Sequence, residues 1–418
     1  MGPTILLDKS ALQSLSRREI IALSRLFTVN IAPVLGMEIL ADLKKGDDPE
    51  AAREQTVILA NKLLQIDSAV NIQHGVLLLN DLLGTPVSMI KKPVVLAGDE
   101  TRHDDGRTGM YYEETDFDRA ILRWQTGDFD AADSILASQW RRSSEELDLE
   151  AYRTRNAKSR LPDPGPSSLG ELTEMLDAYV EATPARTDVL THLIREFGFS
   201  QEHAQRICYR AECMGPGPLS QMSAYGALCA KTGLIFYYGL VHGFIGTRAT
   251  NRIDLDYLYY LPFTHVFVSG DKFHVAMAPC LVRDSQMFVD AAVLKAELKA
   301  IADVWGLPYS EGDKGASQYV PEPLDDPDSL LYKIWKMAFP QWRPGERDLA
   351  PTLTEEQKRQ IVEQVNKMAR AEKSGGGGDQ QESPEFIVRS RTVSIDSPCH
   401  CGSGKSLREC CLRDSDEK

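Results

Sequence analysis

Two short apolar runs, each ended by an acidic residue, constrain the fold of this chain more than any other feature. TILLD at 4–8 predicts a buried strand that ends at Asp8, and THVFVSG at 264–270 predicts another that is followed by Asp271. FTVNIAP at 27–33 is rich in β-branched residues and stops at a proline, which is typical of a further strand. In an open parallel α/β sheet, ligands bind where the carboxyl ends of the strands converge. We therefore expect an α/β fold in which the two strand-end aspartates meet.

Two further acids belong to helices next to these strands. VLGMEILADLKK at 34–45 predicts a helix that carries Glu38 in its first turns, and DLDYLYYL at 254–261 predicts a short helix that begins with Asp254. These carboxylates can close around the two strand-end aspartates. Hard divalent cations prefer oxygen ligands, and Mg²⁺ or Mn²⁺ held by carboxylates is a common arrangement for hydrolysis of phosphodiesters.

Each acid also has an ordinary structural interpretation. Asp8 is well placed to cap a helix after its strand, and Glu38 is favourable near a helix N-terminus. Asp271 suits a turn, and Asp256 competes with Asp254 for the same role from another face of the helix. The four acids therefore predict a site only when they are taken together.

The segments LLDKSAL, APVLGMEIL and NRIDLDYLYYLPFTHVFVSGDKFH resemble, in order and local context, the acidic motifs of PIN-like nucleases. The resemblance implies that Asp8, Glu38, Asp254 and Asp271 are catalytic and hold Mg²⁺ or Mn²⁺, with Ser269 in the family's Thr/Ser position. It also implies a metal-dependent endoribonuclease that leaves a 5′ phosphate and a 3′ hydroxyl, with DNA as a possible substrate.

The resemblance divides the chain into parts. A PIN-like parallel sheet with flanking helices is expected from 1–45 and 223–310, and these blocks are separated by 46–222, a segment of mainly helical periodicity that predicts a large helical insertion. A C-terminal helical extension at 311–371 precedes the Gly-rich linker at 372–385.

The C-terminal stretch SPCHCGSGKSLRECCLRD, within 386–418, contains four closely spaced cysteines. Its GSGKS lacks the upstream glycine, the buried strand and the long helix of a phosphate-binding loop. Four thiolates suit a tetrahedral structural zinc, and the CxCx8CC spacing resembles the SEC-C zinc knuckle of the SecA translocase and of many bacterial proteins. The resemblance implies that the knuckle binds zinc and docks a protein or RNA; the implied ligands are Cys399, Cys401, Cys410 and Cys411.

Composition limits the remaining choices. A net charge of −14 argues against non-specific duplex binding as the main function, although it leaves a nuclease with local substrate contacts possible. Arg248, Asn251, Arg252 and Lys272 are candidate phosphate contacts. The longest apolar run, 233–246, is too short to span a bilayer. The chain opens without a signal-peptide pattern, and its other cysteines lack a disulfide pattern, so we expect a cytoplasmic protein.

Two other functions remain open from the sequence. The first is a non-catalytic adaptor that binds proteins through its helical surface and through the knuckle, which the acidic charge favours. The second is a metal-dependent phosphohydrolase that acts on nucleotides through the same acids. Convergence of the four carboxylates in the folded chain is the feature that distinguishes a catalytic protein from the adaptor.

Overall fold

The computed structural model describes residues 2–64, 68–95, 100–102, 108–110, 116–156, 165–183, 188–307 and 322–345. All of these residues belong to the first of two compact units, Met1–Arg347. The predicted linker, the predicted knuckle with its four cysteines, and most of the predicted extension at 311–371 lie outside the described residues.

A five-stranded, all-parallel sheet forms the centre of the described unit, in the order β3-β2-β1-β6-β7. Its strands are β1 (Thr4–Leu7), β2 (Thr28–Ile31), β3 (Ser68–Val70), β6 (Val266–Ser269) and β7 (Met287–Asp290). The α/β class and the three predicted strands are confirmed. The chain adds β2 and β3 on one side of β1 and later adds β6 and β7 on the other side. The order therefore reverses between β1 and β6.

Strand β3 lies inside 46–222, the segment for which helical periodicity predicts an insertion, and it pairs with β2 in the sheet. Three residues are too few to display the alternation of a strand, so periodicity alone does not detect β3. The segment 46–222 therefore contributes one strand to the sheet in addition to its helices.

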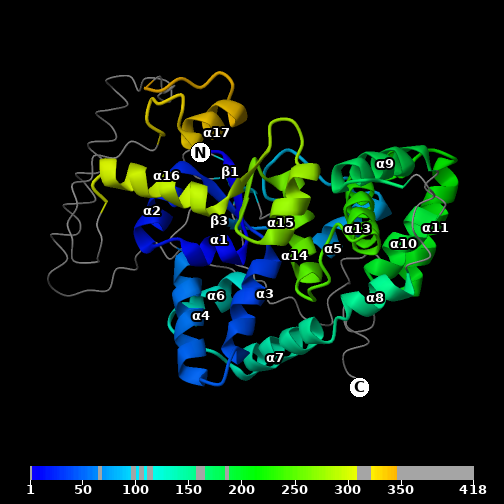
Figure 1. Cartoon of the computed structure of the whole chain (residues 1–418), viewed down its shortest axis with the longest axis horizontal. Coiled ribbons are helices and arrows are strands. Elements are labelled where there is room, and N and C mark those ends of the chain that lie inside the picture. Colours follow the sequence, from blue (N-terminus) through cyan, green and yellow to red (C-terminus); the bar gives the residue numbers. More distant parts are fainter. Residues whose placement is uncertain are drawn as a thin grey trace. The chain divides into compact units, whose positions relative to one another are not determined.

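The helices next to the sheet follow from local sequence signals. Proline at the first position of α3, Pro33, suits a helix start, and Ser16 with Glu19 forms a capping box that begins α2. The helix α16 packs against α1 and α2 (Figure 1). The bounds are α1 (Lys9–Ser14), α2 (Arg17–Leu26), α3 (Pro33–Ala41), α4 (Pro49–Leu64), α5 (His74–Leu83), α14 (Asn251–Leu258), α15 (Lys272–Met277), α16 (Ala291–Val304) and α17 (Leu330–Ala338), with the 3-10 turns η1 (Asp42–Lys44), η3 (Leu261–Phe263) and η4 (Ala278–Cys280).

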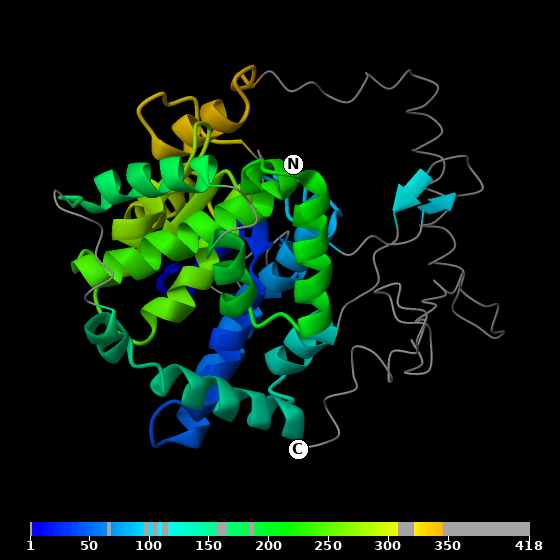
Figure 2. The same cartoon turned by 90° about the vertical axis from the view of Figure 1, so that its right-hand side faces the viewer.

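Several other helices gather around one long, buried apolar helix, α13 (Ala224–His242). It packs against α5, α9, α10 and α14, as Figure 2 shows from the side of the green helices. The remaining helices are α6 (Asp116–Gln125), α7 (Ala131–Glu145), α8 (Leu149–Arg155), α9 (Leu169–Ala182), α10 (Asp188–Glu196), α11 (Gln201–Met214) and α12 (Leu219–Met222); β4 (Glu100–Arg102) and β5 (Thr108–Met110) form a separate antiparallel pair. Over the described ranges, no helix is long and apolar enough to cross a membrane.

Candidate functional site

The two strand-end aspartates lie on neighbouring strands, at the point where the strand order reverses. Asp8 follows β1 and Asp271 follows the last residues of β6, and these strands pair directly. Both residues also cap helices: Asp8 accepts a hydrogen bond from the backbone N–H of Ala11 at 2.8 Å, and Asp271 accepts one from the N–H of Phe273 at 2.8 Å. The structural and the functional interpretations of these acids are therefore compatible.

Two serines join the loops that follow β1 and β6. Ser10 donates its hydroxyl to the Asp8 carboxylate, 2.9 Å from each oxygen, and accepts the backbone N–H of Gly270 at 2.9 Å. Ser269 donates to Asp8 Oδ2 at 2.6 Å and accepts the N–H of Asp271 at 2.9 Å. These bonds hold the Asp8 carboxylate, which is only 3% exposed, in one orientation beside the loop that carries Asp271.

His274, which is fully buried on α15, connects Asp8 to the helix that carries Asp254. Its Nε2 lies 2.8 Å from the backbone carbonyl oxygen of Asp254, which only accepts, so Nε2 carries a hydrogen. Its Nδ1 lies 2.9 Å from Ser269 Oγ and 3.3 Å from Asp8 Oδ2. Because the Ser269 hydroxyl donates to Asp8, a hydrogen on Nδ1 fits this arrangement best. The geometry therefore favours the imidazolium form of His274.

The electrostatics of His274 agree with this form. Burial by itself lowers the pKa of the imidazole, but the hydrogen bond and charge of Asp8, together with the charge of Asp254, outweigh burial and raise the pKa. His274 was not identified as part of the site from the sequence. Its position three residues after Asp271, one turn into the helix that Asp271 caps, is the only signal that the sequence holds for it.

Glu38 and Tyr257 join α3 to α14. The Tyr257 hydroxyl donates to Glu38 Oε2 at 2.5 Å. Burial raises the pKa of the Glu38 carboxyl and the charge of Asp8 raises it further, while Tyr257 and the Lys9 ammonium oppose the change. The Lys9 ammonium lies 3.0 Å from the Glu38 carbonyl oxygen and 2.7 Å from the Asp42 carboxylate. The pKa of Glu38 therefore depends on the charges of Asp8 and His274, which belong to the strand-end site.

Asp254 is the acid of the cluster that has a buried oxygen without a hydrogen-bond partner among the described residues. It is 8% exposed, and the oxygen without a partner is Oδ2. Burial, with the charges of Glu38 and Asp271, raises its pKa to about 7, although His274 acts in the opposite direction. Asp256 instead pairs with Arg252 at 2.8 Å. The structure therefore places Asp254, and not Asp256, with the other predicted acids.

The cluster offers oxygen donors of the kind that a hard cation prefers, and the free Asp254 oxygen is available to one. As the side chains lie, however, no three Asp, Glu, His or Cys residues within the described ranges converge closely enough to hold a metal ion. The chemistry of the donor set thus fits Mg²⁺ or Mn²⁺, and binding requires the carboxylates to move closer together.

A cleft of about 500 Å³ opens beside Asp271. Three of the four predicted phosphate contacts line it: Arg248, Asn251 and Lys272. Arg248 is well exposed and lies 3.3 Å from the Asp271 carboxylate. Arg252 is instead engaged by Glu196 at 3.0 Å and by Asp256, so the prediction that it contacts phosphate finds no support.

No family model matches this chain, and comparison with curated proteins and with solved structures finds no match either. Any functional conclusion therefore rests on the geometry of the site.

Replacing His274 with asparagine is expected to lower the free energy of unfolding by about 2 kcal/mol, because it leaves buried polar partners unsatisfied. Urea denaturation at pH 7 measures this change. His203→Asn, a half-buried position on α11, serves as the control and should change stability by less than about 0.5 kcal/mol. Equal stability of the two variants would contradict the connecting role of His274.

Proposed function

We propose that this protein is a metal-dependent nuclease of PIN-like type that cleaves RNA. The observation that carries the proposal is the position of Asp8 and Asp271 after neighbouring strands, at the reversal point of a parallel sheet, where α/β folds bind their ligands. Asp254, whose buried oxygen has no partner among the described residues, adds the second-strongest support.

The raised pKa values of Glu38 and Asp254 support a cation as the missing partner. Acids that are buried near one another lose stability when all of them ionise, and a divalent ion reverses that penalty. Asp8, Glu38, Asp254 and Asp271 would hold the Mg²⁺ or Mn²⁺. A bound metal would lower the pKa of the attacking water and neutralise charge on the phosphate.

The protein's own residues position these groups. Ser10, Ser269 and His274 orient Asp8, and Tyr257 orients Glu38. Arg248, at the mouth of the cleft, can leave Asp271 for a phosphate, since its pair with this acid is largely exposed to water. The proposal needs no histidine as a general base, because His274 is buried and already carries both ring protons.

The C-terminal cysteines enter the proposal separately, because they lie outside the described residues. Cys399, Cys401, Cys410 and Cys411 would bind a structural zinc, and the knuckle would recruit RNA or a protein through the Gly-rich linker. Removal of the cysteines is therefore expected to affect recruitment and not the chemistry of the acidic site.

Cleavage of fluorescent single-stranded RNA and DNA in Mn²⁺, in Mg²⁺ and in EDTA tests the proposal. We expect wild-type protein to cleave RNA in either metal and to lose the activity in EDTA, because the carboxylates alone do not activate water. Isothermal titration with Mn²⁺ gives a second readout that is independent of substrate. Absence of both cleavage and Mn²⁺ binding at the acids would favour the non-catalytic adaptor, which the net charge of −14 already makes the main alternative.

A further inference from the structure

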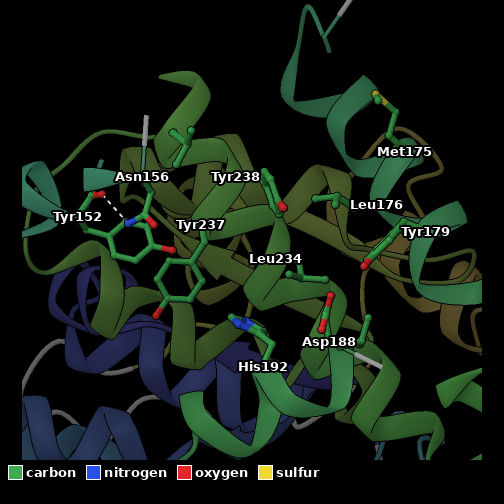
Figure 3. Close-up of a pocket in the computed structure, with 12 residues that line it drawn as sticks. Tyr152, Asn156, Met175, Leu176, Tyr179, Asp188, His192, Leu234, Tyr237 and Tyr238 are labelled. Carbon is green, nitrogen blue, oxygen red and sulfur yellow. Dashed lines mark hydrogen bonds between the residues drawn. The ribbon is translucent and has the colours of Figure 1, made fainter. Parts of the chain in front are cut away.

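A second cavity, of about 580 Å³, lies between α8, α9, α10 and α13, away from the acidic cluster. Figure 3 shows its aromatic lining. Four tyrosines come from three of these helices: Tyr152, Tyr179, Tyr237 and Tyr238. The volume is that of a small-molecule site and accommodates a nucleotide.

The tyrosine rings are arranged as a connected aromatic surface. The rings of Tyr152 and Tyr237 lie 4.9 Å apart between centroids, and the Tyr237 hydroxyl is fixed by Glu196 at 2.6 Å. Burial raises the pKa of Tyr152, with a contribution from Tyr238, and the pKa of Tyr238 is raised by burial and by Tyr179. All four side chains line the same cavity, and Tyr152 and Tyr237 are in ring contact. Tyr179 is 45% exposed and forms the accessible rim.

The charges of the two cavities differ as the two parts of a nucleotide do, the uncharged base and the anionic phosphate. Among the described residues that line the aromatic cavity, none is a lysine or an arginine, and Asp188 is the one carboxylate. This lining disfavours a phosphate and suits the flat face of a base. The cleft beside Asp271, in contrast, carries Arg248 and Lys272, which suit a phosphate.

One helix connects the two cavities. Leu234 to Val241 of α13 contribute to the aromatic cavity, and Phe244 to Gly246, directly after this helix, line the cleft. Tyr238 lies four positions before His242, the last residue of α13, or about 6 Å at the rise of a helix, and Phe244 comes two residues further along the chain. Successive nucleotides of a stacked strand lie about 3.4 Å apart, so a few nucleotides span this distance. In addition, Glu196 holds Tyr237 of the cavity and Arg252 of α14, the helix that carries Asp254.

We propose that the aromatic cavity binds an unpaired base of the substrate strand, a few nucleotides from the phosphate that enters the cleft. The inference rests on the proposed function and deepens it, because it specifies a single-stranded substrate. Stacking on tyrosine accepts any base, so the site selects unpaired nucleotides and not a particular sequence.

The test compares two ligands in EDTA, so that binding is measured without cleavage. The ligands are a fluorescent single-stranded RNA of about six nucleotides and a sugar-phosphate strand of the same length without bases. We expect wild type to prefer the RNA by about 10-fold or more, a typical contribution of base stacking on an aromatic side chain. Tyr179→Leu should abolish most of this preference, while Tyr179→Phe, which keeps the ring, should retain it.

Tyr209→Leu is the matched control, because Tyr209 is a 69% exposed tyrosine on α11 that does not line the cavity. An unchanged preference in Tyr179→Leu would overturn the inference, and the proposed function would stand if cleavage persists. Failure of wild type to bind either strand would overturn both. A third outcome would also overturn the inference. If wild type shows no preference for bases, and tetramethylammonium quenches the tyrosine fluorescence of wild type but not of Tyr179→Leu, the cavity binds an alkylammonium group instead of a base.

Discussion

Asp271→Asn is expected to reduce metal-dependent RNA cleavage by about 100-fold or more, while it changes the stability of the fold by less than about 0.5 kcal/mol. Asparagine is as good a helix N-cap as aspartate, so it retains the hydrogen bond from Phe273 N–H that begins α15. The substitution therefore removes one negative charge from the cluster and little else. Cleavage rates with saturating RNA in Mn²⁺, together with thermal unfolding of the same preparations, measure both effects.

Asp290→Asn supplies a control of the same geometry. Asp290 also ends a strand of the sheet, β7, and caps the following helix by accepting the N–H of Ala292 at 2.8 Å. It belongs to the next strand along and not to the reversal point between β1 and β6. We expect this variant to cleave at the wild-type rate. Equal rates for Asp271→Asn and wild type would show that cleavage arises at another site or from a contaminant.

Asp254→Asn is expected to raise the free energy of unfolding at pH 8 by about 2 to 4 kcal/mol. The pKa of Asp254 is about 7 in the folded state, so the carboxyl keeps its proton up to about this pH, whereas the unfolded chain releases it near the ordinary pKa of 3.8. Between these values the folded state binds more protons, so stability falls as pH rises and is lowest above pH 7. Because one pKa unit corresponds to about 1.4 kcal/mol, the full shift sets an upper limit of about 4 kcal/mol.

Urea denaturation of wild type and Asp254→Asn at pH 4 and at pH 8 measures this effect, which should nearly vanish at the lower pH. Addition of Mg²⁺ or Mn²⁺ at pH 8 should raise the melting temperature of wild type and have less effect on the variant, because the metal binds the folded ionised acids. A variant that is less stable than wild type at pH 8 would mean that Asp254 is a structural residue satisfied in the folded state.

The individual elements of the sheet were predictable where their sequences are apolar throughout. TILLD and THVFVSG are buried at every strand position, and the acids that follow them are at the strand ends as expected. Strands β3 and β7 were not predicted: β3 has only three residues, and β7, although as long as β1, is only partly buried. Their places in the sheet come from pairing with β2 and β6.

The acids themselves were identified from their positions in the sequence, but their relations were not. Only the fold brings Glu38 of α3 beside Tyr257 of α14, 219 residues away along the chain, and Asp8 beside Ser269 and His274. No local pattern encodes the burial that leaves Asp254 with a raised pKa and an unpartnered oxygen.

The sequence by itself determined that 4–8, 27–33 and 264–270 form strands and which acids follow two of them, because these features depend on propensity and spacing between near neighbours. The tertiary structure alone decided that Asp8 and Asp271 stand on adjacent strands, that His274 connects Asp8 to Asp254, and that four tyrosines from three helices share one cavity. The physical reason is that desolvation, charge interaction and strand pairing act through space, between residues whose separation in the sequence places no limit on their distance.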